Sequence, residues 1–356
     1  MLSSDEANLA VHFFMVQEKG NFTDPATGKR TGKNILHLRK QLQDLASDLG
    51  LSVEELNMKL TTMKRKLYEE RKKRICPSKD DKILTDWNGL MIAGLAKAAQ
   101  AFDEPSYVLA AMRAAKFILS KMLDPKGTLL HRYRSGEAAI AGFLDDYAFF
   151  IWGLLDLYEA TFDVFYLRGA LELTNTLLQS FWDETEGGFF ITALDSEKLP
   201  VRSKEHYDGA IPSGNSVVAL NLLRLSRITS NPELERRANV TMGAFAERIR
   251  AAPEAHTLML SALCFAFGPS FEVVIVGKRE SEDTTAMLEA IRRRYLPSKV
   301  ILLRQIDQDS TEIDGIAEFI SHYESIGNVS TTYVCRNHKC SLPTTNVEEM
   351  LRLMSG

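Results

Sequence analysis

The sequence predicts a mainly α-helical protein in which helical hairpins form an α/α toroid, followed by a small α/β appendage. From about Trp87, a two-helix pattern recurs after 59 residues. In each copy the first helix is apolar almost all round and the second is amphipathic, which predicts an inner ring of helices backed by an outer ring. After Gly268 the pattern changes to short β-branched runs, which predicts the appendage.

Composition sets the broad class. The 356 residues are 45% hydrophobic and 25% charged, enough for one or two buried cores. The net charge is -4, so the chain as a whole has no electrostatic attraction for nucleic acid or for an anionic membrane. No apolar run approaches the roughly 18 residues of a membrane span, and the start of the chain lacks the order of a signal peptide. We expect a cytoplasmic protein with neither nucleic-acid nor membrane partners.

The first part of the chain predicts a helix near Ser4 to Gln17, a loop rich in Gly, Thr and Lys, and a helix from about Ser52 to Arg74. The last helix ends in KRKLYEERKKR. Glu69 and Glu70 interrupt this basic run, which indicates a solvated face with compensating charge pairs.

The repeats are clearest over residues 86–251. WNGLMIAGLAKAAQAF and DYAFFIWGLLDLYEATF superpose so that Gly94 falls on Gly153 and Ala101 falls on Ala160. NSVVALNLLRL begins a third, weaker copy, and AHTLMLSALCFAF predicts one more helix. We therefore expect a toroid domain over residues 1–268.

Residues 269–356 predict a small α/β domain. FEVVIVG, the amphipathic EDTTAMLEAIRRRY and KVILLRQ follow the order of a βαβ unit with two parallel strands. TTYVC predicts a third strand, and TTNVEEMLRLM a closing helix capped by Thr345 or Asn346.

The four cysteines are too few and too scattered for a disulfide framework, so reduced thiols are expected. Cys335 and Cys340 lie close together in CRNHKC, with His338 between them. A metal or redox pair is one interpretation and a turn beside a strand is the other. The turn is favoured because zinc sites normally use four ligands and no second cluster is present. No metal and no cofactor are expected.

Several distinctive strings occur in a fixed order: GKNILHL, DDKILTDWNGLMIAGLA, GFLDDYAFFIWGLLDLYEA, FWDETEGGFF, YDGAIPSGNSVVALNLLRL and TTYVCRNHKCSLPTT. With these strings the chain resembles the C-terminal two-thirds of the thioredoxin-domain-containing, spermatogenesis-associated protein family. The resemblance implies an α/α toroid similar to six-hairpin glycosidases and N-acylglucosamine 2-epimerases. The family's thioredoxin-like domain has no counterpart in this chain, and about nine predicted helices compare with twelve in a closed ring. An incomplete toroid is therefore expected.

The chemistry is expected where the inner helices begin, because their N-termini meet on one rim. The three helix starts read TDWNG, LDDYA and PSGNS, and the 59-residue shift places Asp86 on Asp145 and Trp87 on Asp146. Helix N-termini carry positive partial charge and free N–H donors, which suits hydroxyl-rich or anionic ligands.

Carboxylates are the candidate catalytic groups, because two of them about 5 to 10 Å apart can act as acid and base on a sugar. The candidates are Asp86, Asp145, Asp146 and Asp208. Aromatic rings on which a sugar stacks and groups that form hydrogen bonds with it are the substrate-binding candidates: Asp81, Trp87, Asn88, Tyr147, Trp152, His206, Ser213 and Asn215.

Helix capping is the alternative role for these polar residues. Asp and Ser before an apolar helix are ordinary N-caps, each contributing about 1 kcal/mol. Capping accounts for one carboxylate at a helix start but not for two in succession. We expect Asp146 to cap its helix and Asp145 to point into the ring beside Asp86 and Asp208.

Two functions remain open. The first is binding or transformation of a small saccharide, with glycoside hydrolase or sugar-epimerase-like activity. The second is a non-catalytic scaffold for a thioredoxin-like domain or chain. A sugar enzyme needs a wet, acidic, aromatic-lined cavity, whereas a scaffold can fill the ring with apolar side chains.

Overall fold

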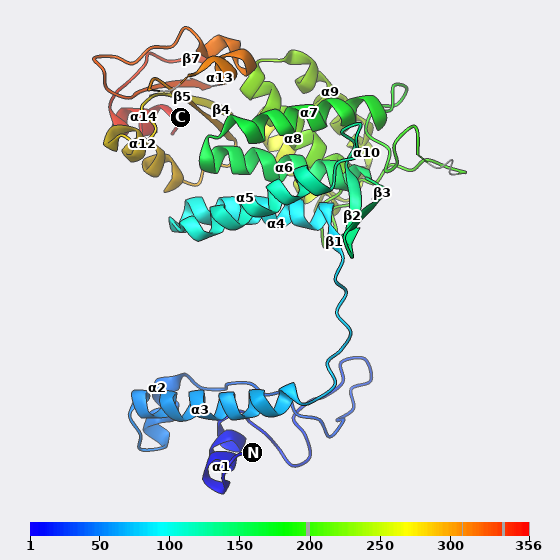
Figure 1. Ribbon diagram of the computed structural model, residues 1–356, viewed down its shortest axis with the longest axis vertical. Coiled ribbons are helices and arrows are strands. Elements are labelled where there is room, and N and C mark those ends of the chain that lie inside the picture. The colour runs from blue at the N-terminus through cyan, green and yellow to red at the C-terminus, as the bar shows by residue number, and fades with distance from the viewer. Residues whose placement is uncertain (197–199, 308, 337–338, 356) are drawn as a thin grey trace. The chain divides into compact units, whose positions relative to one another are not determined.

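A computed structural model describes residues 1–196, 200–307, 309–336 and 339–355 (Figure 1). Contacts divide the chain into two compact units, Met1–Asp80 and Asp81–Gly356. The hairpins and the α/β part therefore lie together in the second unit, and domain limits at 1–268 and 269–356 stay a prediction. In the part of the chain that is described, no helix is long and apolar enough to cross a membrane.

The first unit contains α1 (Ser4–Phe13), α2 (Leu42–Asp48) and α3 (Val53–Lys72). Capping boxes start α1 and α3, with Ser3 and Ser52 as the N-caps. The apolar faces of the three helices share a small core: Ala10, Phe13, Leu45, Ala46, Leu56, Leu60 and Met63. The basic end of α3 is exposed and carries ion pairs one helical turn apart, Glu69 with Lys72 and Glu70 with Lys73, as predicted for a solvated face.

Three helical hairpins form the body of the second unit: α4 (Thr85–Phe102) with α5 (Pro105–Lys121), α6 (Leu144–Thr161) with α7 (Val164–Ser180), and α8 (Gly214–Thr229) with α9 (Pro232–Ala244). The turns repeat as well. Each first helix ends on a left-handed residue, Asp103, Phe162 or Ser230. The next residue in each case caps the second helix: Glu104, Asp163 and Asn231.

The first helices of the hairpins form an inner row, α4–α6–α8, which α11 (Thr257–Phe267) continues beyond α8. Nearly every residue of α6 and α8 is buried, whereas α5, α7 and α9 bury one face each. This confirms the mainly α fold with inner and outer helices. The short α10 (Ala246–Ala251) joins the third hairpin to α11.

Glycine sets the spacing of α4 and α6. A Cβ added to Gly89 would lie 2.5 Å from the carbonyl carbon of Phe149, and one added to Gly153 would lie 2.8 Å from the carbonyl oxygen of Gly89. The two backbones therefore touch where they cross, and no larger residue fits there without moving a helix.

An inner ring formed by these helices predicts that Met91, Trp152 and Leu220 are buried, and for Met91 this prediction is wrong. Met91 is 61% exposed, while Trp152 and Leu220 are half-buried. The helices that α4 contacts extensively are α5 and α6, so α4 forms one edge of the inner row. Its far face, with Trp87, Met91 and Phe102, consequently meets solvent.

A small antiparallel sheet lies at the other end of the hairpins from the α/β part (Figure 1). It consists of β1 (Ile83–Leu84), β2 (Leu130–Arg134) and β3 (Glu137–Ala141), in that order. β2 and β3 form a hairpin inserted between α5 and α6. These strands were not predicted, because they are short and only partly buried and so leave little pattern in the sequence.

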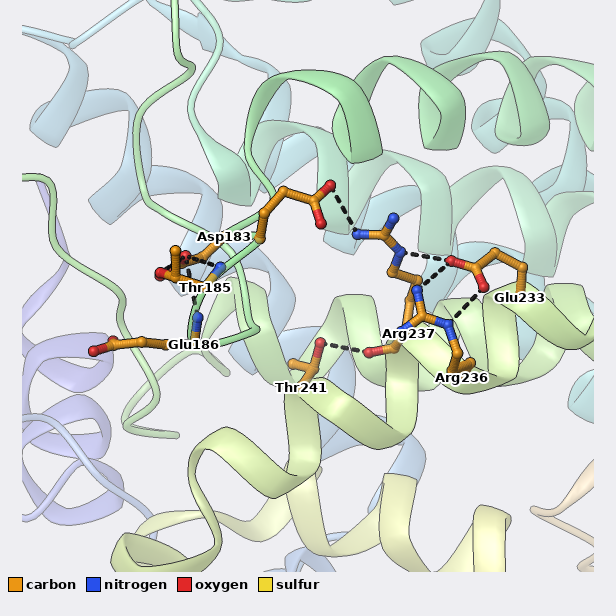
Figure 2. Close-up of polar contacts among 8 residues, drawn as sticks. Asp183, Thr185, Glu186, Glu233, Arg236, Arg237 and Thr241 are labelled. Carbon is orange, nitrogen blue, oxygen red and sulfur yellow. Dashed lines mark hydrogen bonds and ion pairs between the residues drawn. The ribbon is translucent and has the colours of Figure 1, made fainter.

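The segment after α7 folds into a tight turn that is held against α9 (Figure 2). Asp183 accepts the N–H groups of Thr185 and Glu186, and Gly187 and Gly188 both have positive φ. Arg237 of α9 contacts Glu184 of the turn and Glu233 of its own helix. The two glycines of WDETEGGFF, which predict a turn at this point of the chain, do lie in one.

The α/β part has a four-stranded sheet with the order β5–β4–β6–β7. β4 (Phe271–Gly277) and β5 (Lys299–Gln305) are parallel and are linked by α12 (Glu282–Arg292), which confirms the βαβ prediction. β6 (Thr331–Arg336) runs antiparallel to β4, and β7 (Lys339–Cys340) pairs with β6. The short α13 (Thr311–Ile316) follows β5, and Asn346 caps the closing α14 (Val347–Leu353).

Cys335 and Cys340 form a disulfide, which corrects the expectation of reduced thiols. The register of β6 and β7 places the two residues directly opposite each other, with Cα atoms 3.8 Å apart. His338, the third member of the metal alternative, lies outside the described residues.

Candidate functional site

The starts of α4 and α6 meet at one buried carboxylate. Asp146 is not the N-cap that was expected, because α6 begins at Leu144 and Phe143 is its N-cap. As the third helical residue, Asp146 accepts the N–H of Phe143 through Oδ2 at 2.8 Å, the reciprocal contact of a capping box. Through Oδ1 it accepts the N–H of Asp86 at 3.1 Å, which links α6 to α4. Both oxygens also lie 3.0 Å from Nδ1 of His131. Asp146 is 0% exposed, and these contacts account for its burial.

Asp145 is the carboxylate that capping leaves over. It is half-buried in the first turn of α6, and the N–H of Gly214 at the start of α8 hydrogen bonds to it. Burial, followed by the charges of Asp146 and Asp86, raises its pKa from 3.8 to about 6. Gly214 makes room for this carboxylate, because a side chain there would collide with it.

Asp86 lies beside this pair at the start of α4. Its Oδ1 accepts the N–H of Trp87 at 2.7 Å. Burial raises the pKa of Asp86, and the charge of Asp146 raises it further. Asp86 and Asp145 are therefore two carboxyl groups that both favour the protonated form more than an exposed aspartate does.

His131 is a site residue that the sequence analysis missed. It lies on β2, which pairs with β1 directly before α4, and its side chain is 22% exposed. The carboxylate of Asp146 only accepts hydrogen bonds, so Nδ1 of His131 carries a proton and Nε2 is left for another partner. The hydrogen bond to Asp146 raises the pKa of His131. Because His131 lies on an insertion between two hairpins, neither the repeat nor any local motif pointed to it.

One donor atom from each of Asp86, His131 and Asp146 lies within 4.8 Å of the others, a spacing that a metal ion could use. Both oxygens of Asp146, however, already accept protein N–H groups. The arrangement is better suited to fixing a proton on His131 than to binding a cation.

Asp208 and Ser213 have capping contacts. Asp208 Oδ1 accepts the N–H of Ser213, while its Oδ2 accepts the N–H groups of Leu258 and Met259 at the start of α11. Ser213 caps α8 by accepting the N–H of Ser216. Asp208 thus joins the starts of two inner helices, and its acceptor capacity is directed to backbone rather than to a ligand.

Three further candidates bind protein backbone. Asn215 is fully buried and bridges the N–H and carbonyl of Phe189 and the carbonyl of Glu205. Asn88 donates to the carbonyl of Leu84. Tyr147 is 0% exposed and accepts the N–H of Leu129, so the expectation of a sugar platform at Tyr147 is wrong.

The two candidate tryptophans are far apart along their helices, Trp87 in the first turn of α4 and Trp152 in the middle of α6. Trp87 is 63% exposed and directly follows Asp86 in α4. Trp152 lies further along α6 and lines a separate cavity with Lys97 and Arg224, so it does not join the rim. Asp81 is exposed and pairs with Arg134 on β2 at 2.6 Å.

His206 belongs to a second histidine cluster. Its Nδ1 lies 3.0 Å from Nε2 of His256, and Arg248 contacts its other nitrogen. Burial, followed by the charge of Arg248, lowers its pKa. Nδ1 of His256 donates to the carbonyl of Ala252, so its Nε2 is the acceptor for His206. Both ring nitrogens of His206 therefore have protein partners.

The chain is homologous over nearly its whole length to spermatogenesis-associated protein 20. It is 35% identical to the human protein over 359 aligned residues and 34% identical to the rat protein over 358. Uncharacterized protein B0495.5 of Caenorhabditis elegans is 31% identical over 360 residues. These alignments cover 97% or 98% of this chain but only 45% to 48% of the relatives, so the chain spans about half their length. No family model matches the chain.

Among solved structures, the chain is similar in part to several sugar-processing proteins. The GH76 alpha-mannanase BT2949 of Bacteroides thetaiotaomicron has 19% identity and a TM-score of 0.40, with 48% of this chain and 47% of that chain covered. Cellobiose 2-epimerase from Bacillus thermoamylovorans has 14% identity and a TM-score of 0.45, with 61% and 62% covered. At these scores the similarity is partial, and the assignment of roles depends on the side chains themselves.

Proposed function

We propose that the protein binds a saccharide at the rim formed by the starts of α4, α6 and α8 and transfers protons to or from it. The observation that carries this proposal is the state of Asp145. It is a partly buried carboxyl group at the junction of two inner helices, it does not cap its own helix, and its pKa is raised to about 6. A raised pKa of this kind is more frequent at functional sites than at solvated surface acids.

Asp145 and His131 supply the two proton-transfer roles. Near neutral pH, an acid with a pKa of about 6 is mainly a carboxylate, whereas His131, with its raised pKa, retains more of its proton than an ordinary histidine. Asp145 then acts as the general base and His131 as the general acid. Asp146 is a positioning residue, because it fixes the proton on Nδ1 of His131 and holds the ring in place.

Asp86 and Trp87 complete the proposed binding surface. Asp86 can accept hydrogen bonds from sugar hydroxyl groups or share the acid role with His131. The exposed indole of Trp87 offers a flat apolar face for a sugar ring. The same groups would serve a glycoside hydrolase or an epimerase, since both reactions need a proton donor and a proton acceptor across a sugar.

The test is a panel of monosaccharides, disaccharides and aryl glycosides, screened by thermal stabilisation and then by turnover. Asp145→Asn and His131→Gln are expected to abolish binding or turnover without lowering the melting temperature by more than a few degrees. Glu137→Gln is the matched control, because Glu137 is an exposed acid on the neighbouring strand β3. Loss of function in the control to the same degree, or no ligand in the panel, would contradict the proposal.

A scaffold function is the second candidate, and the exposed apolar face of α4 favours it. Trp87, Met91 and Phe102 are 63%, 61% and 75% exposed, which is unusual for three large apolar residues on one helix. In this function the chain, which resembles its longer relatives, would bind a thioredoxin-like domain or chain in the cytoplasm. Trp87→Ala with Met91→Ala would then abolish capture of a purified thioredoxin-like partner, whereas Asp145→Asn would not.

A further inference from the structure

A second cluster of charges lies at the far ends of the inner helices. Lys97 of α4, Asp156 and Glu159 of α6 and Arg224 of α8 occupy the last turns of their helices or lie near them. Lys97 is eleven residues beyond Asp86, about 16 Å along the helix at 1.5 Å per residue. This cluster is therefore separate from the rim.

The charges of these four side chains balance one another. Arg224 lies 2.7 Å from Asp156 and 3.0 Å from Glu159. Lys97 lies 3.0 Å from Glu159 and 3.3 Å from Asp156. The side chains of Asp156 and Glu159 are 1% and 2% exposed, so each buried carboxylate has two cationic partners. Such pairing is what buried carboxylates require.

Two further cationic side chains line a cavity beside this cluster, and in the described part of the chain neither is paired with a carboxylate there. Lys299 at the start of β5 and Arg294 after α12 line a cavity of about 320 Å³ together with the paired groups. Lys299 donates to the carbonyl of Leu296 at 3.2 Å. Within the described residues, neither Lys299 nor Arg294 forms an ion pair. The cavity thus has four cationic and two anionic side chains.

The position of Lys299 is electrostatically unfavourable in the protein alone. Burial lowers the pKa of Lys299, and the charges of Lys97 and Arg224 lower it too, while Glu159 and Asp156 offset only part of this. An ammonium group has three donors, and one of them has a protein acceptor. A bound anion would supply the missing partner and would be attracted by the surplus positive charge.

The remaining walls favour an organic molecule over a bare inorganic ion. Trp152, Leu220 and Pro297 line the cavity, and its volume is near the lower limit for small-molecule sites, about 300 Å³. We propose that this cavity binds a small organic anion, whose phosphate or carboxylate contacts Lys299 and Arg294 and whose body packs on Trp152. This site is independent of the proposed saccharide site.

Calorimetric titration of the full chain tests the site, with glucose 6-phosphate and citrate as the anionic probes and glucose as the neutral one. At least one anion is expected to bind, and glucose is not expected to bind at this cavity. Lys299→Gln and Arg294→Gln should each weaken the binding about tenfold or more, since each removes a charged partner of the anion.

Arg293→Gln is the matched control, because Arg293 is the adjacent arginine, is 80% exposed and pairs with Glu289 on the surface of α12. Binding in this variant should be unchanged. If Lys299→Gln fails to fold, Arg294→Gln still tests the proposal, because Arg294 is exposed and its substitution should not disturb folding. Absence of binding for both anions, or an equal loss in Arg293→Gln, overturns the proposal.

Asp145→Asn separates the two sites. Anion binding that survives Asp145→Asn and is lost in Arg294→Gln supports the cavity whether or not the rim proves to be a saccharide site. Anion binding that is lost in Asp145→Asn and kept in Arg294→Gln places the ligand at the rim and overturns the cavity proposal.

Discussion

The carboxylate of Asp146, in the first turn of α6, accepts the backbone N–H of Asp86, in the first turn of α4, at 3.1 Å. A side chain at the start of one inner helix thereby satisfies a free donor at the start of its neighbour. The same carboxylate accepts the N–H of Phe143 at the start of its own helix and holds His131. One buried residue therefore determines how two helix starts and one proton-transfer group lie relative to one another.

Asp146→Asn should lower the free energy of unfolding by about 1 to 3 kcal/mol, because the amide nitrogen cannot accept the N–H groups that the carboxylate oxygens accept. It should also lower the pKa of His131, since the carboxylate that favours the imidazolium ion is removed. Denaturant unfolding and an NMR titration of the imidazole measure the two effects. An unchanged pKa of His131 would contradict the assigned contact.

Asp145 should make stability depend on pH in the opposite sense to a salt-bridged aspartate. Its pKa is about 6 when folded and near 3.8 when unfolded, so between these values the unfolded state ionises first. The contribution of Asp145 to the free energy of unfolding is greatest below about pH 4 and is lost as the pH rises through about 6. Denaturant unfolding between pH 4 and pH 7 measures this trend.

Asp145→Asn removes that trend, so the variant should gain stability relative to the original protein as the pH rises from 4 to 7. Glu137→Gln, an exposed acid nearby, should show no such relative gain. A constant difference between Asp145→Asn and the original protein across this range would show that the pKa is not raised.

Gly89→Ala should lower the free energy of unfolding by about 1 to 3 kcal/mol, because the added methyl group would lie 2.5 Å from the backbone of Phe149 and force α4 away from α6. Gly94→Ala is the matched control in the same helix, because nothing lies within 4 Å of its added Cβ. There the helix propensity of alanine should stabilise the protein by up to about 1 kcal/mol. Thermal or denaturant unfolding of the two variants should therefore differ in sign.

Asp208→Ala should lower the free energy of unfolding by about 2 to 4 kcal/mol, since it leaves three backbone N–H groups at the starts of α8 and α11 without their acceptor. Asp208→Asn keeps one acceptor oxygen and should lose less. If Asp208→Ala instead abolished ligand binding with unchanged stability, Asp208 would be a ligand-binding residue and not a cap.

The hairpins and the βαβ unit were predictable because their signals are long and periodic. The 59-residue shift also relates the left-handed turn residues Asp103 and Phe162. The parallel pairing of β4 and β5 follows from the order of two β-branched runs around one amphipathic helix.

The exposure of Met91 was not predictable, since periodicity marks an apolar face but not whether another helix covers it. The disulfide of Cys335 and Cys340 depends on the pairing of β6 with β7, which places the two residues opposite each other. Four intervening residues allow that pairing but do not require it.

The site was predictable only in outline. Two carboxylates in succession indicated two different contacts, and in the structure Asp146 serves the starts of α6 and α4 while Asp145 contacts Gly214 at the start of α8. The repeat indicated that Asp86 lies near them, but the site roles stay predictions. His131 was beyond reach because its position depends on the pairing of β1 with β2, which contributes no periodic signal. The substrate roles of all these residues, and a cytoplasmic location, remain predictions.

The contact between Gly89 and Gly153 has a consequence for how such a protein can change over evolutionary time. Gly89 and Gly153 carry no functional group, and they let the backbones of α4 and α6 touch below the rim. An exchange of the exposed Trp87 can therefore change the rim without changing how these two helices cross. The glycine contact is not itself repeated, because under the 59-residue shift Gly89 corresponds to Ala148. The close crossing therefore belongs to this one pair of helices and is not copied with each hairpin.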